Sequence, residues 1–334
     1  MTTRRFTVAI AATAAALLLV TGCSNGTSTD SSSGSGPDGY EPATVSSCGH
    51  EETFDKPPER VVVQPDILVE VLVALGLEDR IVAYAADSDF EPLDRYKETI
   101  AQLPSHSTGS LDRETVIAEE PDLFYSQINF DESMVEDYEP LGIPLLFTTL
   151  YCNEYAPADD SGKPDLVQSR YDDIADLGRI FDVTDRAAEL IDSLQEQVDD
   201  ARAENDAESV DVAAIGFFSG VDGPLSARPG GNLVDQLIGI AGGTNVYGDE
   251  DSQDAEEVAI ESLIERNPEA IVVEQMSDSD FDEVREYLRS DERFSDIPAV
   301  ENDDITSIQR SEQFAGIRFP DAIERFANTF QNVR

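Results

Sequence analysis

The most regular hydrophobic pattern in the chain predicts one long amphipathic helix over residues 182–205. Thr184 can cap this helix, and Asp185 lies in its first turn, where the helix dipole favours an acid. The apolar positions recur at helical spacing, at Ala187, Leu190, Ile191, Leu194, Val198 and Ala201. We therefore expect one face of the helix to pack against protein and the opposite, charged face to meet solvent.

The chain on either side of this helix carries the same pattern twice. Residues 113–125 (RETVIAEEPDLFY) align without a gap with residues 260–272 (IESLIERNPEAIV), so that Glu114 matches Glu261 and Pro121 matches Pro268. Each copy predicts a short helix that is ended by proline and followed by an apolar strand.

Each copy is also preceded by an apolar strand (61–63 and 212–218) and by a helix that ends near glycine (72–76 and 233–243). These patterns predict an α/β protein with two lobes, each built on a central sheet, joined by a single long linking helix. Two unrelated α/β halves with chance similarity are the alternative.

The N-terminus predicts export and lipid attachment. Arg4 and Arg5 precede an apolar run, residues 8–20, that is too short for a comfortable membrane span and suits a secretory signal. The run ends in LVTGC (19–23), which resembles the bacterial lipoprotein cleavage box, in which Cys23 receives the lipid. An uncleaved anchor or a free cysteine is the alternative.

These signals and patterns predict five segments: a signal peptide (1–22), a Gly/Ser-rich flexible tether (23–45), an N-terminal lobe (46–165), a linking helical segment (166–207) and a C-terminal lobe (208–334). The protein is then extracytoplasmic and touches the outer face of the cell membrane only through its N-terminal lipid.

The charge is extreme, with 70 acidic residues against 22 basic ones, a formal net charge of −48. Removal of residues 1–22 takes away two arginines and no acid, which leaves −50. Such a surface repels nucleic acid and anionic headgroups, so nucleic acid is excluded as a partner. The acids are spread over both halves, which indicates a hydrated surface suited to high or variable salt.

Two cysteines, Cys48 and Cys152, remain in the mature chain. Outside the cytoplasm a lone pair of cysteines favours a disulfide over two free thiols. The bond would connect the start of the first lobe to its far end.

Several motifs, taken in order, resemble the class III substrate-binding proteins of ABC importers, which carry iron-siderophores, haem and cobalamin. In the first half these are KPPERVVV (56–63), LVALGLEDRIVAY (72–84), SLDRETVIAEEPDLFYS (110–126) and LGIPLLF (141–147). In the second half they are DLGRIFDVTDRAAELI (176–191), GGNLVDQLIGIAGGTNVY (230–247), AIESLIERNPEAIVV (259–273) and FAGIRFPDAIERFANTF (314–330). The cysteine positions further resemble actinobacterial members.

The resemblance implies two Rossmann-like α/β lobes bridged by a rigid helix, with the ligand bound in the cleft between them and only slight closure on it. It also implies that Glu114 and Glu261 match the paired glutamates that dock onto arginines of the dimeric permease, which works with an ATPase. Their ordinary alternative is a favourable charge in the first helical turn. Ala259 departs from the family pattern, because a serine cap is usual there.

Ligand-binding candidates follow predicted strands, since open α/β sheets bind ligands at the carboxyl ends of their strands. Guanidinium groups suit carboxylate, hydroxamate or catecholate oxygens around ferric iron, although each arginine could instead form a surface salt bridge. Phe217 and Phe218 alternate sides, so at least one belongs to the core. The candidates are Arg228, Arg310, Arg318, Tyr84, Tyr125, Tyr151, Phe218, Gln64, Gln127 and Gln275.

The sequence favours a monomer that binds a ferric siderophore or a similar metal chelate, with no cofactor or metal site of its own. Cobalamin remains an alternative, as does haem with His106 or a tyrosine as axial ligand. Naked zinc or manganese is disfavoured because the chain has only two histidines, His50 and His106. No GxSxG, HExxH, P-loop or strand-linked GxGxxG motif indicates an enzyme. A surface lipoprotein without a transport role is the alternative from another class.

Overall fold

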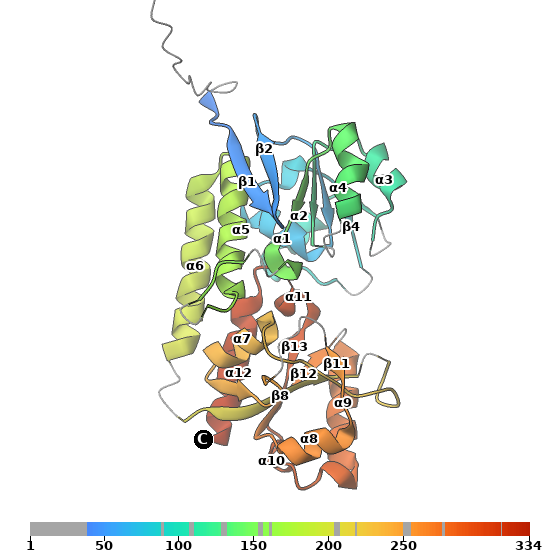
Figure 1. The fold of residues 1–334 in the computed structure, drawn as a ribbon, viewed down its shortest axis with the longest axis vertical. Coiled ribbons are helices and arrows are strands. Elements are labelled where there is room, and N and C mark those ends of the chain that lie inside the picture. The colour runs from blue at the N-terminus through green and yellow to red at the C-terminus, as the bar shows by residue number, and fades with distance from the viewer. Residues whose placement is uncertain are drawn as a thin grey trace, which may run out of the picture. The chain divides into compact units, whose positions relative to one another are not determined.

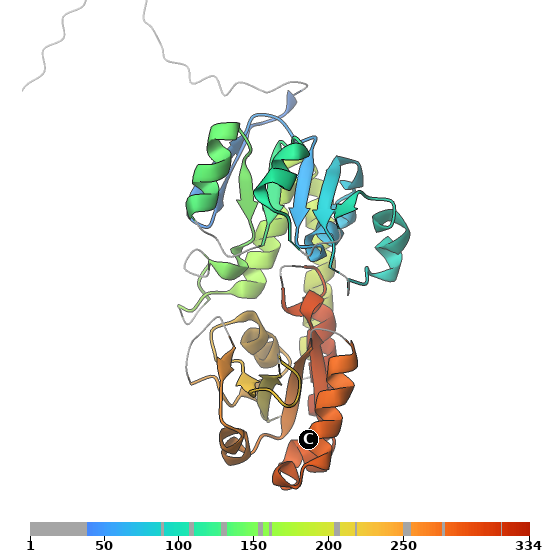
Figure 2. The ribbon, with the colours of Figure 1, turned by 90° about the vertical axis from the view of Figure 1, so that its right-hand side faces the viewer.

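The structure is a computed structural model. It describes residues 39–334 apart from 88–89, 107–109, 128–131, 153–155, 160–161, 204–207, 218, 250–254, 276–277 and 315. Two sheets organise this part of the chain, one in each half, with helices packed on both (Figures 1 and 2).

The described chain opens with a hairpin that is tied to the linking helices and to the first half. Its strands are β1 (Ala43–Ser47) and β2 (His50–Phe54), which pair antiparallel. Tyr40, just before β1, is buried and its hydroxyl donates to the Ile180 carbonyl at 3.0 Å. Tyr40 thus ties the start of the described chain to α5 (Leu166–Ile180). The predicted disulfide between Cys48 and Cys152 is present.

The first sheet is parallel throughout, in the order β5-β4-β3-β6-β7, with the fully buried β3 at its centre. Its strands are β3 (Val61–Gln64), β4 (Ile81–Ala85), β5 (Ser105–His106), β6 (Leu123–Ser126) and β7 (Leu145–Phe147). Its helices are α1 (Ile67–Ala74), η2 (Glu78–Arg80), α2 (Asp94–Ile100), α3 (Arg113–Ala118), α4 (Glu132–Tyr138), η3 (Glu139–Leu141) and η4 (Thr149–Tyr151).

The predicted linking segment holds two helices, α5 (Leu166–Ile180) and α6 (Thr184–Ala203). The left-handed backbone of Asp182, with φ of 56°, separates them. They pack closely because Gly178 has no side chain: a Cβ there would lie 2.5 Å from the Cβ of Ala187. α6 confirms the predicted helix, although Thr184 is its first residue instead of its cap. Figure 1 shows α6, in yellow-green, running alongside elements of both halves.

The second sheet is mixed, in the order β11-β9-β8-β12-β13, with β10 also paired to β8. Its strands are β8 (Val210–Gly216), β9 (Ser226–Ala227), β10 (Gly243–Asn245), β11 (Glu256–Glu257), β12 (Ala270–Gln275) and β13 (Ile305–Gln309). Its helices are α7 (Leu233–Ile240), α8 (Ile260–Arg266), α9 (Asp278–Ser290), η6 (Glu292–Phe294), α10 (Pro298–Glu301), α11 (Arg310–Gln313) and α12 (Phe319–Val333). Strands β8, β12 and β13 are parallel, as in the first sheet.

The predicted sequence repeat is a structural repeat. Glu120 and Asn267, at aligned positions before the prolines, share a left-handed φ of 49°. At the aligned pair after the prolines, the Asp122 carboxylate accepts the Arg60 N–H at 2.7 Å, and the Glu269 carboxylate accepts the Asp211 N–H at 3.0 Å. In each half, an acid thus connects the repeated helix and strand (α3–β6 or α8–β12) by a hydrogen bond to the start of the neighbouring strand, β3 or β8.

The two halves share part of their apolar interior. One buried cluster contains Leu68 of α1, Leu194 of α6 and Phe330 of α12. The rings of Tyr171 and Phe319 lie 5.9 Å apart where α5 meets α12. Side chains of α5, α6 and α12 therefore continue the core between the sheets.

Candidate functional site

Four of the predicted ligand residues lie at the carboxyl ends of parallel strands. Gln64 is the last residue of β3, Gln275 is the last of β12, and Arg310 directly follows β13. Gln127 follows β6, and Arg228 follows the short antiparallel strand β9. Because the parallel strands of each half end at one edge of their sheet, that edge carries most of these side chains.

The three candidate glutamines lie inside the protein and offer little surface to a ligand. Gln64, Gln127 and Gln275 are all buried. The Gln64 side chain accepts the Leu111 N–H at 2.5 Å, and its main-chain carbonyl accepts the Gln127 N–H at 2.9 Å. The amide nitrogen of the Gln64 side chain is buried with no hydrogen-bond partner in the described chain. The peptide bond from Gln64 to Pro65 is cis.

The aromatic candidates lie mostly in the core. Tyr84 and Tyr125 are 7% and 2% exposed, so they have almost no surface to offer a ligand. Burial raises the pKa of both hydroxyls above the usual range. Tyr151 ends η4, and nothing further is described of its side chain. Phe218 lies outside the described residues, and its neighbour Phe217 is buried in the core of the second half, as the alternation predicted for one of the pair.

All three candidate arginines form ion pairs, and exposure separates them. The side chains of Arg228 and its partner Glu274 are 15% and 2% exposed, and those of Arg318 and its partner Glu70 are 10% and 1% exposed. The side chains of Arg310 and its partner Asp87 are 25% and 36% exposed. Removing one member of a buried pair leaves an unpaired charge in the interior, which is costly in free energy. An exposed pair contributes little to stability, so its partners separate at low cost. Arg310 is therefore the arginine that can exchange its partner most readily.

The pairs of Arg318 and Arg310 join the two halves of the chain. Arg318 precedes α12 and grips the Glu70 carboxylate of α1 through two nitrogens, with a further bond to the Glu91 carbonyl at 2.7 Å. Arg310 Nη1 lies 2.6 Å from Asp87 Oδ2, just after β4. These contacts make Arg318 a structural cross-link as well as a candidate ligand residue.

Arg228 is held within the second half. Its Nε donates to Glu274 Oε1 at 2.7 Å and a second nitrogen binds the other carboxylate oxygen, which gives a bidentate pair. The same guanidinium reaches Gln313 Oε1 at 3.4 Å. An anionic ligand at Arg228 would have to compete with a buried carboxylate at close range.

Behind Arg310 lies a buried acid that the sequence analysis did not single out. Asp66 is 1% exposed, and its Oδ2 accepts the Asp87 N–H at 2.7 Å. Its Oδ1 is buried without a hydrogen-bond partner among the described residues. Burial raises the pKa of this carboxyl, while the Asp87 N–H and the Arg310 guanidinium act to lower it.

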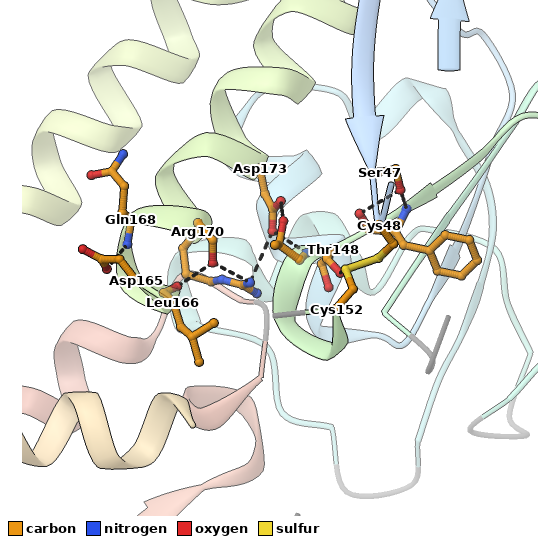
Figure 3. A network of polar contacts seen from close by, with 12 residues as sticks. Ser47, Cys48, Thr148, Cys152, Asp165, Leu166, Gln168, Arg170 and Asp173 are labelled. Carbon is orange, nitrogen blue, oxygen red and sulfur yellow. Dashed lines mark hydrogen bonds and ion pairs between the residues drawn. A yellow bond between two sulfur atoms is a disulfide. The ribbon is translucent and has the colours of Figure 1, made fainter. Parts of the chain in front are cut away.

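A second polar network braces the end of the first sheet (Figure 3). Asp173 of α5 accepts the Thr149 hydroxyl at 2.7 Å and the Thr149 N–H at 3.2 Å, beside the disulfide. Arg170 points toward it, with Nη2 3.5 Å from Asp173 Oδ2. Nε and Nη1 of Arg170 are buried with no hydrogen-bond partner in the part of the chain described. Burial raises the pKa of Asp173, against the lowering effect of Arg170 and Thr149. The network links α5 to η4 beside the disulfide.

The two predicted docking glutamates occupy equivalent, exposed positions. Glu114 lies in the first turn of α3, which Asp112 caps by accepting the Thr115 N–H at 2.7 Å. Glu261 lies in the first turn of α8, where Ala259 is the cap residue and offers no side-chain bond. Both glutamates are thus exposed to solvent. The N-terminus of α8 lacks a side-chain cap, as its sequence predicted.

Three further observations bear on the site. A cavity of about 710 Å³ lies among α5, α6 and α7, and none of the predicted ligand residues lines it. Within the described residues, no group of three or more His, Cys, Asp or Glu side chains could hold a metal ion. Nor does any described helix combine the length and apolar character that a membrane span needs.

Three solved structures illustrate the similarity of the chain to known proteins. An ABC-type Fe3+-hydroxamate transport protein from Saccharomonospora viridis is 28% identical, with a TM-score of 0.70 over 86% of this chain and 99% of that one. The haem-binding protein of Roseiflexus sp. is 18% identical, with a TM-score of 0.64 over 82% and 98% of the two chains. The vitamin B12 binding protein of Vibrio cholerae is 16% identical, with a TM-score of 0.61 over 83% and 98%.

No curated protein sequence matches the chain significantly. The family model described as periplasmic binding protein matches residues 61–311, from β3 of the first sheet to α11 after β13. The match spans both sheets and the linking helices, whereas the sequence resemblance continued through the last helix. The chain therefore belongs to the periplasmic binding protein family, as a class III solute-binding protein of an ABC importer and not an enzyme.

Proposed function

We propose that the protein captures a ferric siderophore outside the cytoplasm and delivers it to a permease dimer driven by its ATPase. The observation that carries this choice is the 28% identical Fe3+-hydroxamate transport protein, which aligns over 99% of its own length. The other two relatives are below 25% identity and share the fold alone.

The chemistry of Arg310 supports the same choice. Its guanidinium lies just after β13 and is partly exposed, next to the more exposed carboxylate of Asp87. A planar guanidinium binds the paired oxygens of hydroxamate, catecholate or carboxylate groups better than a point charge does. Arg228 and Arg318 would stabilise the same ligand mainly through their charge, because the N–H groups of both guanidinium groups already bind buried glutamates.

Haem and cobalamin are the alternatives within the family. His106, the histidine considered as an axial haem ligand, has its Nε2 3.0 Å from Glu119 Oε1. Haem ligation by this nitrogen would have to break that contact. Cobalamin needs no ligand from the protein, so the structure offers no such argument against it.

A titration of the protein against a panel of chelates distinguishes these ligands. The chain has no tryptophan and 10 tyrosines, so tyrosine emission or calorimetry reports binding. We expect saturable binding, micromolar or tighter, for one class among a ferric trihydroxamate, a ferric tris-catecholate and ferric citrate. Haem and cobalamin should bind at least about tenfold more weakly, and the iron-free chelators serve as controls. Tightest binding of haem or cobalamin would overturn the proposed ligand, as would a lack of binding throughout the panel.

We also propose that Cys23, which lies outside the described residues, carries the lipid anchor, with the following Gly/Ser-rich residues as tether. Mass spectrometry of detergent-extracted protein should find a mature chain that begins at Cys23 with a diacylglyceryl group. A mature N-terminus elsewhere, or an unmodified cysteine, would contradict the anchor.

A further inference from the structure

Arg310 has a counter-ion that comes from the other half of the molecule. Its Nη1 lies 2.6 Å from Oδ2 of Asp87, and both side chains are partly exposed. The guanidinium also lies over the ring of Phe314, with 5.9 Å between its carbon and the ring centroid. A ligand anion that binds Nη1 of Arg310 must separate this nitrogen from Asp87.

Asp87 is directly coupled to a second carboxylate. Its N–H donates to Oδ2 of Asp66 at 2.7 Å, and Asp66 is almost fully buried with Oδ1 unpartnered in the described chain. Asp66, Asp87 and Arg310 thus form a cluster of two acids and one base. The charge of Arg310 favours the ionised form of Asp66, while the charge of Asp87 opposes it.

Other ionisable groups near Asp66 do not substitute for Arg310. Tyr84, at the end of β4, is buried and its pKa is raised by that burial, so it stays neutral near pH 7. Glu70, one turn further along α1, is neutralised by Arg318. Once Arg310 turns to a ligand, Asp66 loses a positive charge that favours its ionised form, while the charge of Asp87 still opposes that form, which favours protonation of Asp66.

We propose that Asp87 competes with the ligand for Arg310, and that a chelate whose anionic oxygens displace it binds together with one proton, taken from solvent by Asp66. This inference rests on the proposed function, because it takes a metal chelate with anionic oxygens as the ligand. It makes Asp87 a specificity-determining residue, since a ligand without such oxygens gains nothing from displacing it.

Calorimetry tests the competition. A ferric trihydroxamate, a ferric tris-catecholate and ferric citrate are titrated into wild type and Asp87→Asn between pH 5 and 8, in buffers of different ionisation enthalpy. For the complex that binds wild type, we expect proton uptake that approaches one per chelate. Asp87→Asn should abolish most of that uptake and tighten binding about two- to fivefold, the range of an exposed ion pair.

The matched control is Asp94→Asn, which removes the same charge from an exposed residue that begins α2. It should change neither affinity nor proton uptake, which excludes a general effect of lower net charge. Unchanged or weaker binding by Asp87→Asn, or binding to wild type without proton uptake, would overturn the proposal. Melting temperatures of both variants confirm that they are folded.

A measurement without ligand separates this inference from the proposed function. Carboxyl-carbon NMR of 13C-aspartate-labelled protein follows the resonance that Asp66→Asn removes. We expect it to titrate at higher pH in Arg310→Gln than in wild type, because the variant lacks the cation. The same titration in both proteins would disprove the coupling. If no chelate binds, the proposed ligand fails, while this result still decides whether the three groups act together.

Discussion

Burial gives the arginines of the site different roles. Arg228 and Arg318 each hold a carboxylate that is at most 2% exposed, whereas the partner of Arg310 is 36% exposed. A buried pair contributes little net stability but is costly to break, because the remaining charge has no water around it. The same residue type therefore cross-links the protein at one position and is available to a ligand at another.

The pair of Glu70 and Arg318 gives the clearest stability prediction at this scale. Glu70→Gln leaves the Arg318 guanidinium without its countercharge, so we expect the free energy of unfolding to fall by about 3 to 5 kcal/mol. Urea denaturation measures this change. The double variant Glu70→Leu with Arg318→Leu is the control and should recover most of the loss. A loss below about 1 kcal/mol in the single variant would contradict a buried, coupled pair.

Sequence reasoning named the arginines as candidate ligand residues but did not identify the acids that pair with them. Among 70 acids, nothing in the order of residues marks Asp66 or Asp87. Glu70 and Glu274 did carry a signal, because each interrupts an apolar run, ILVEVLVA in α1 and AIVVEQ in β12. A lone acid within a buried element needs a countercharge, so such positions are where a partner should be sought.

At the scale of elements, the repeat was predicted because it rests on local patterns. A short helix, a stop before proline and an apolar strand are readable in both α3–β6 and α8–β12. In the sequence, Asp122 and Glu269 appear only as two acids at aligned positions. Its role appeared when the structure placed the starts of β3 and β8 beside these carboxylates.

The short antiparallel strands β9 and β11, two residues each, were not predicted. Two residues carry no alternation of apolar and polar positions, so only pairing with a neighbour identifies them as strands. These strands make the second sheet mixed where the first is parallel. The linking segment shows the same limit: α6 was predicted from its stripe, while the closeness of α5 depends on Gly178 meeting Ala187.

At the scale of the whole molecule, the repeat places one exposed glutamate on each half. If Glu114 and Glu261 dock onto arginines of the permease dimer, Glu114→Lys with Glu261→Lys should lower uptake of the ferric chelate at least about tenfold, because attraction becomes repulsion at both contacts. Uptake of the radiolabelled iron complex in cells measures this effect, and binding to the isolated protein should stay unchanged.

The matched control for docking is Glu98→Lys with Glu265→Lys, which makes the same charge change at exposed positions on α2 and α8. Its uptake should stay near that of wild type. Equal uptake by all three proteins would remove the docking role of Glu114 and Glu261. An equal loss in both double variants would assign the effect to net charge.

By itself, the sequence determined the α/β class, the duplicated halves, the disulfide partners and the family. These follow from the periodicity of apolar residues, from the number of cysteines and from motifs in a given order, all of which are properties of the chain taken linearly. Only the tertiary structure decided which acid neutralises which arginine and which of those pairs remains accessible. Ion pairing depends on distance and burial in space, and residues such as Asp87 and Arg310 meet across 223 positions of sequence.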